Sequence, residues 1–189
     1  DRWLKDVHVW EIRKDDEAVE IPFYGYIDMS TTNGKLVVKH KNAEYVKAVP
    51  YDVPIIGDNN QVVNTLRLWS AEPASTYPDN AFEYHRKLRD ISSMLYPNDE
   101  TEDGKILRLK QQYFFVSAGV KSAIKRHKNI FGTCRNLHEK VCFHINDTHP
   151  ALIIPELMRI LVDEEGIEWT EAWNITKNSC AYTNHTILA

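Results

Sequence analysis

The spacing of the apolar residues changes along this chain from every second position to every third or fourth. Among the first 70 residues, Val19, Ile21, Phe23 and Ile27 recur at even spacing, which is typical of a half-buried strand. Farther along, an apolar series runs from Ile106 to Ile124 in steps of three or four, which is typical of an amphipathic helix. Because the chain carries both periods, we expect a mixed α/β fold.

Residues 1–70 are predicted to form a β-rich portion. Strands are expected at Val7–Ile12 and at Tyr45–Pro50, the second of which should stop at its proline. Asn33 and Gly34 lie between two further strand-like runs. They predict a hairpin, because both residue types accept positive φ.

Residues 71–139 are predicted to be mainly helical. One helix is expected at Phe82–Leu95 and a second along the series that begins at Ile106. A polar loop near residues 96–104 joins them. Such a loop can move and gate a site, but on the residues alone a plain connection between the helices is the favoured interpretation.

Residues 140–189 are predicted to form a βαβ unit. Lys140–Ile145 and Ser179–Thr183 read as its two strands. One helix is expected to open at Pro155 and another to cover Trp169–Asn178. The predicted elements place three tryptophans in the core: Trp69, Trp169 and Trp173.

The composition argues against several classes of protein. Lysine and arginine total 23 against 27 aspartates and glutamates, a net charge of −4, whereas nucleic-acid-binding domains normally carry a basic excess. No apolar run approaches the roughly 20 residues that cross a bilayer. Three widely spaced cysteines, and a start without methionine or signal peptide, favour reduced thiols and a cytoplasmic location.

Polar clusters follow both strands of the predicted βαβ unit. Asn146–His149 comes after the first strand and Thr183–Thr186 after the second. Ligands of open α/β sheets bind beyond the carboxyl ends of the strands, so both clusters are expected to face one crevice. A purely structural interpretation remains open, in which Asp147 or Thr148 caps a helix and His185 is held by backbone.

Two other functions stay open on the residues alone. His144, Asp147 and His149 could hold the metal of a hydrolase, but His144 is expected inside a strand, so the three side chains need not converge and a metal site is disfavoured. A non-catalytic carbohydrate-binding module is the second alternative, and an exposed aromatic platform would indicate it.

Four longer motifs resemble those of the α-glucan phosphorylases, which act on glycogen, starch or maltodextrin. They occur in the order of that family and at its approximate spacing, and together they cover essentially the whole chain. The matching segments are Asn64–Ala71, Leu95–Asp99 with Gly104–Phe114, Ile145–Pro150 with Ile154–Arg159, and Cys180–Thr186, and Tyr51–Pro54 matches upstream of all four.

The resemblance implies a glycosyltransferase of carbohydrate metabolism. Such an enzyme cleaves the terminal α-1,4-glucosyl unit of a glucan with inorganic phosphate and releases α-glucose 1-phosphate with retained configuration. It uses pyridoxal phosphate, whose phosphate group relays a proton to the attacking phosphate. The implied fold is glycosyltransferase type B, of which this chain would be a partial, Rossmann-like N-terminal domain, and the implied parent is a homodimer.

The resemblance also assigns roles to single residues. His185 would be catalytic, contacting the glucosyl unit and stabilising its oxocarbenium-like transition state. The residues that would bind substrate are Asn98, Asp99 and Glu100 in the gate loop, Asp147 and His149 beside the acceptor sugar, and Thr186.

Three positions depart from the allosteric animal enzymes. Glu100 replaces an asparagine that bonds glucose, and Thr101 replaces an aromatic residue of a purine-stacking inhibitor site. Lys125 and Arg126 match an arginine pair that binds an effector phosphate, and the lysine weakens bidentate recognition.

The family's Schiff-base lysine and its glycine loop match no part of this chain. We therefore expect a fragment that is inactive by itself and binds no cofactor.

Overall fold

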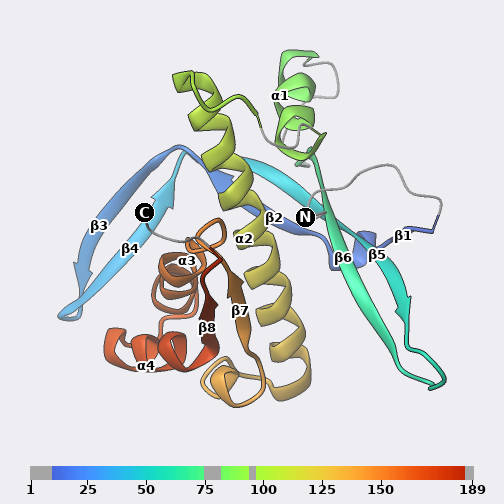
Figure 1. The fold of residues 1–189 in the computed structure, drawn as a ribbon. Helices are drawn as coiled ribbons and strands as arrows, with labels where there is room; N and C mark the ends of the chain where they lie inside the picture. The colour runs from blue at the N-terminus through green and yellow to red at the C-terminus, as the bar shows by residue number, and fades with distance from the viewer. Residues whose placement is uncertain (1–9, 75–81, 94–96, 186–189) are drawn as a thin grey trace. The chain divides into compact units, whose positions relative to one another are not determined.

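The computed structural model describes residues 10–74, 82–93 and 97–185 (Figure 1). The chain divides into two compact units, residues 1–23 with 45–118 and residues 24–44 with 119–189. Strands and helices both occur in it, so the expectation of a mixed α/β fold is confirmed. The assignment of all three sequence portions to one domain stays a prediction.

The first unit is built on a sheet whose longest strand is β5 (Glu44–Ile56). β5 is hydrogen-bonded to β1 (Ile12–Arg13), to β2 (Val19–Phe23) and, in antiparallel register, to β6 (Val63–Pro73). A single 3₁₀ turn, η1 (Asp15–Glu17), lies between β1 and β2.

The prediction that Pro50 ends its strand is wrong, because β5 runs on to Ile56. The carbonyl oxygen of Pro50 accepts the N–H of Lys14 at 3.0 Å. In a strand, the nitrogen and the carbonyl of one residue point to the same side, so the missing N–H of Pro50 faces the side of β1. That strand is two residues long and demands few ladder bonds, so the proline is tolerated there.

The core of the first unit joins the sheet to two helices, α1 (Phe82–Ser93) and the first part of α2 (Glu102–Phe131). Trp69 is buried as predicted, and the ring of Phe23 meets the edge of Tyr113 at a centroid distance of 5.3 Å. The apolar series of α2 is only partly buried, since Ile106 and Leu109 are 49% and 56% exposed. The first predicted helix also included residues 94 and 95, which lie outside the described residues.

The second unit contains the predicted hairpin, formed by β3 (Tyr26–Thr32) and β4 (Lys35–Lys41). Asn33 and Gly34 take φ values of 52° and 74°, which is the left-handed conformation that a two-residue hairpin turn requires. The strand predicted through Ile27 is interrupted, because Tyr24 and its neighbouring glycine also take positive φ and end β2. Ile27 consequently lies on the hairpin and is 51% exposed.

The remainder of the second unit is a βαβ arrangement. β7 (Phe143–Asn146) and β8 (Cys180–Thr183) pair in parallel, as predicted, and Figure 1 shows them side by side. The elements around and between them are the 3₁₀ turn η2 (Leu137–Glu139), α3 (Ile153–Arg159), the π-helical turn η3 (Ile160–Glu164) and α4 (Trp169–Ser179). Pro155 is the third residue of α3 rather than its first, still within the turn whose N–H groups need no intrahelical partner.

The prediction that Trp169 and Trp173 belong to the core is wrong. Their side chains are 64% and 47% exposed. The buried face of α4 carries Ala172, Ile175 and two hydroxyl residues, Thr176 and Ser179. On a helical wheel both tryptophans fall on one flank of that face, with Trp169 next to Thr176, so helical periodicity alone does not exclude them from the core.

Candidate functional site

The carboxyl ends of β7 and β8 meet at one edge of the parallel pair. The register joins Asn146 to Thr183, the last residue of each strand. The N–H of Asp147 then donates to the carbonyl oxygen of Thr183 at 2.8 Å. The two polar clusters found in the sequence therefore lie together at this edge.

Asp147 turns the chain away from the sheet. Its φ of 64° is left-handed, a conformation that aspartate tolerates because its side chain bonds locally. One carboxylate oxygen of Asp147, Oδ1, accepts the N–H of Thr148 at 2.8 Å. The side chain of Asp147 is half-buried, whereas those of His149 and His185 are exposed. Thr186 lies outside the described residues.

His144 has a specific partner across the strand pair. Its Nε2 lies 2.8 Å from the hydroxyl oxygen of Thr183. In the part of the chain that the structure describes, no group of three or more histidine, cysteine, aspartate or glutamate side chains is placed to hold a metal ion.

The gate loop is folded onto the start of α2 in the first unit. The side-chain oxygen of Asn98 accepts the N–H of Glu100 at 3.0 Å, and the hydroxyl of Thr101 accepts the N–H of Gly104 at 3.1 Å. Asp99 forms an ion pair with Arg108. The three predicted substrate-binding side chains of this loop are exposed.

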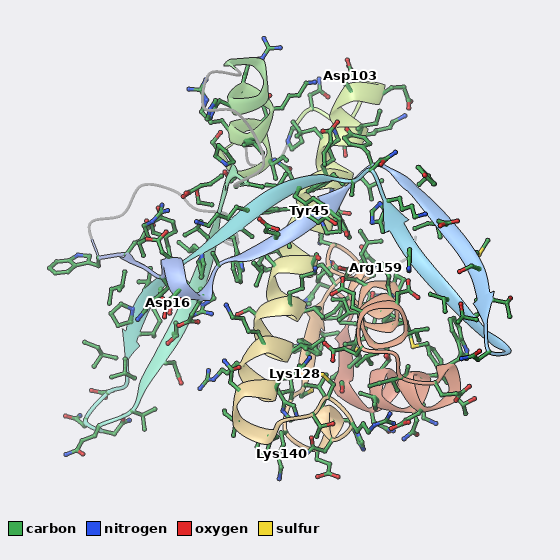
Figure 2. The ribbon with its side chains drawn as sticks, turned by 180° about the vertical axis from the view of Figure 1, so that it is seen from behind. Asp16, Tyr45, Asp103, Lys128, Lys140 and Arg159 are labelled. Carbon is green, nitrogen blue, oxygen red and sulfur yellow. The ribbon has the colours of Figure 1, made fainter. Side chains whose placement is uncertain are left out.

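The predicted effector residues Lys125 and Arg126 are exposed on α2. Lys128, labelled in Figure 2, is engaged instead in an ion pair with Glu165 at 2.7 Å. That hydrogen-bonded pair raises the pKa of Lys128. Lys128 therefore carries a positive charge that Glu165 neutralises.

The described residues do not fit pyridoxal phosphate. A Schiff-base lysine must lose its proton, which burial among apolar groups favours. None of the lysines whose side chains the structure describes is buried, and the half-buried Lys121 pairs with Glu164 at 3.3 Å.

Two partners of the predicted site residues were missed by the sequence analysis. Arg108 pairs with Asp99 across a loop and a helix start, a spacing that follows no regular period. Thr183 pairs with His144. The contact between Thr183 and His144 could have been found from the predicted strand pairing. His144 pairs with Ala181, and Thr183, two residues farther along the same strand, projects from the same face.

The chain as a whole resembles proteins of known family. The sequence model for carbohydrate phosphorylases matches residues 1–189. The glycogen phosphorylase of Bacillus subtilis is 51% identical over 190 residues, which cover 100% of this chain and 24% of that protein. The brain forms of glycogen phosphorylase from Rattus norvegicus and Homo sapiens are each 43% identical over 205 residues, with the same coverage.

The chain thus spans about a quarter of the length of the curated relatives it matches. The match runs through both compact units and through both strand ends of the candidate site. This chain belongs to the carbohydrate phosphorylase family.

Proposed function

We propose that this chain is part of a glycogen phosphorylase. Such an enzyme uses inorganic phosphate to release α-glucose 1-phosphate from the ends of an α-1,4-glucan. The family match along the whole chain supports this, together with relatives that carry that name. The geometric observation behind the proposal is the bond between Asp147 and Thr183, which brings the two polar clusters to one edge.

Each candidate residue has a distinct task in this proposal. His185, two residues beyond the end of β8, contacts the glucosyl unit at the bond to be cleaved. A polar group held where positive charge develops stabilises the transition state more than the ground state, so it raises the rate more than it tightens binding. Asp147 and His149, on the loop that follows β7, bind the acceptor sugar. Thr186 makes a further contact with the substrate.

The gate loop controls entry of the glucan. Asn98 and Glu100 lie in the turn and Asp99 is paired with Arg108, so opening the loop exchanges these contacts for water. Exposed ion pairs of this kind contribute about 1 kcal/mol or less, so a bound glucan could offset their loss. Lys125 and Arg126 form a weak site for a phosphate-bearing effector.

The proposal extends to the parent protein. We take this chain to be a partial, Rossmann-like N-terminal domain of a type B glycosyltransferase. The parent enzyme would be a cytoplasmic homodimer that binds pyridoxal phosphate through residues outside this chain. In the described residues, no helix has the length and apolar character needed to cross a bilayer. No finding favours the carbohydrate-binding module.

The test uses the complete polypeptide that carries this chain. It is assayed for α-glucose 1-phosphate formed from glycogen, starch or maltodextrin with inorganic phosphate. Replacing His185 by alanine should lower kcat about 100-fold, the size expected when one transition-state contact is lost, with a smaller change in the KM for glucan.

A matched histidine deletion serves as the control. His40 lies on the β4 hairpin strand, so His40→Ala should leave kcat within about twofold of the starting enzyme. The proposal fails if the complete polypeptide forms no α-glucose 1-phosphate, or if His185→Ala retains full kcat.

A further inference from the structure

We propose that Thr183 is a positioning residue that holds both halves of the candidate site in one arrangement. This inference rests on the proposed function, because it concerns the same site. The carbonyl oxygen of Thr183 accepts the N–H of Asp147, and the hydroxyl of Thr183 forms a hydrogen bond with Nε2 of His144. Thr183 lies two residues before His185.

The register of the strands makes the side-chain contact possible. His144 is paired with Ala181, and Thr183 is the second residue after Ala181. Residues two apart on a strand project from the same face, so His144 and Thr183 stand on one face of the pair, diagonally opposed. The distance of 2.8 Å from Nε2 to Oγ1 is that of a good hydrogen bond.

The strand face that carries His144 and Thr183 is exposed to solvent and is not part of the core. His144, Asn146, Ala181 and Thr183 are all exposed, whereas Ile145 on the opposite face is 3% exposed. Loss of the hydroxyl therefore leaves the buried side of the sheet intact. Loss of the hydroxyl instead removes the contact with His144 that positions the two loops leaving this edge.

The two loops leave the sheet directly at this edge. Each strand is four residues long, and Asp147 leaves β7 at once in the left-handed conformation. The bond from Asp147 to Thr183 joins the residue just after β7 to the last residue of β8. A residue that fixes this bond and also clamps the preceding strand through His144 sets the direction in which Asp147 and His185 emerge. Small displacements of such groups lower the rate of reaction more than they lower binding.

The test compares two substitutions of Thr183 in the complete polypeptide. Thr183→Val keeps the shape and removes the hydroxyl, whereas Thr183→Ser keeps the hydroxyl. We expect Thr183→Val to lower kcat about threefold to tenfold, the range for one lost hydrogen bond, with the KM for glucan within about twofold. Thr183→Ser should stay within about twofold of the starting enzyme in both constants.

A double-mutant cycle with His144 identifies the contact responsible. His144→Leu should reproduce the loss seen for Thr183→Val, and the double variant should be no slower than either single variant. Thr133→Val is the matched control, because the Thr133 hydroxyl accepts the N–H of Arg135 at 3.1 Å in the same unit but away from the site. It should leave kcat unchanged. Full activity of Thr183→Val, failure of Thr183→Ser to rescue, or additive losses in the double variant would overturn the inference.

Amide hydrogen exchange decides the same question without activity. The N–H of Asp147 donates to the backbone carbonyl of Thr183, which Thr183→Val keeps, but the substitution removes the hydroxyl contact to His144 that holds the two strand ends together. Peptides covering residues 143–149 should therefore exchange about threefold to tenfold faster in Thr183→Val and unchanged in Thr133→Val. If the starting polypeptide lacks phosphorylase activity, the proposed function fails while this measurement still stands. Unchanged exchange in Thr183→Val would then refute the positioning role.

Discussion

Gly104, the third residue of α2, lies close against the backbone of the gate loop. A Cβ at this position would lie 1.7 Å from the carbonyl oxygen of Asn98 and 2.7 Å from its carbonyl carbon. These are backbone atoms, which cannot rotate away as a side chain can. The loop and the helix start can keep their present arrangement only if this residue has no side chain.

Replacing Gly104 by alanine should therefore destabilise the chain. Alanine in a helix gains up to about 1 kcal/mol over glycine, but overlap with backbone costs about 1–3 kcal/mol or more, so the overlap wins. We expect the free energy of unfolding, measured in urea, to fall by about 1–2 kcal/mol.

Gly119 supplies the control from the same helix. A Cβ there meets nothing within 4 Å, so Gly119→Ala should raise the free energy of unfolding by up to about 1 kcal/mol. Equal effects of the two substitutions would show that Asn98 does not press on α2.

Single residues show which features of the site could be predicted from the sequence alone. Asp147 could be placed at the edge of the sheet, because parallel strands end on the same side and the polar residues follow them. Its left-handed φ and its bond to Thr183 could not be foreseen, since both arise from strand register. Pro50 misled the analysis, because its cost depends on the partner strand it faces and not on local sequence. The functional role of His185 stays a prediction.

Among the elements, α2 is tied to the α3–η3 segment by a small charge network. Glu164 of η3 accepts both Lys121 of α2 at 3.3 Å and Arg159 of α3 at 2.9 Å. Arg159, labelled in Figure 2, also bonds the buried Glu156 at 2.7 Å. Burial raises the pKa of Glu164, but the two cations outweigh it and hold that pKa below its usual value of 4.5.

The sign of the pH dependence follows from this lowered pKa. A carboxyl whose pKa is lower in the folded state stabilises that state above its unfolded pKa and loses this contribution as the pH falls through the folded pKa. We therefore expect Glu164→Gln, which cannot titrate, to lose less stability than the starting chain between about pH 5 and pH 3. Urea unfolding curves across that range measure the difference.

Glu139, an exposed carboxylate of the same unit, provides the comparison. Glu139→Gln should keep the pH dependence of the starting chain. If Glu164→Gln keeps it as well, then the network does not couple α2 to η3 in solution.

The elements themselves were largely predictable, and the exceptions have one physical origin. The hairpin and α4 follow from turn residues and helical periodicity, which are local. The even spacing through Ile27 failed because two positive-φ residues break the strand, and Trp169 was misplaced because residue type does not say which helix face meets a partner. Tertiary contacts decide both.

At the scale of the whole molecule, the chain holds only one part of the chemistry that its family name implies. It carries the candidate sugar-binding residues at the ends of β7 and β8 and in the gate loop. None of its described lysine side chains is buried, and it spans about a quarter of the length of its curated relatives. Transition-state stabilisation by groups that act as a unit is lost almost entirely when most of them are removed.

We therefore expect the purified 189-residue chain to form no α-glucose 1-phosphate from glycogen and inorganic phosphate, even with pyridoxal phosphate added. Borohydride reduction of that mixture should label several exposed lysines at similar low levels rather than one lysine selectively, because none of the described lysine side chains is buried. The complete polypeptide, tested under the same conditions, is the positive control. Turnover by the 189 residues alone would mean that residues of this chain supply the cofactor chemistry. The proposal that pyridoxal phosphate is bound by residues outside this chain would then be wrong.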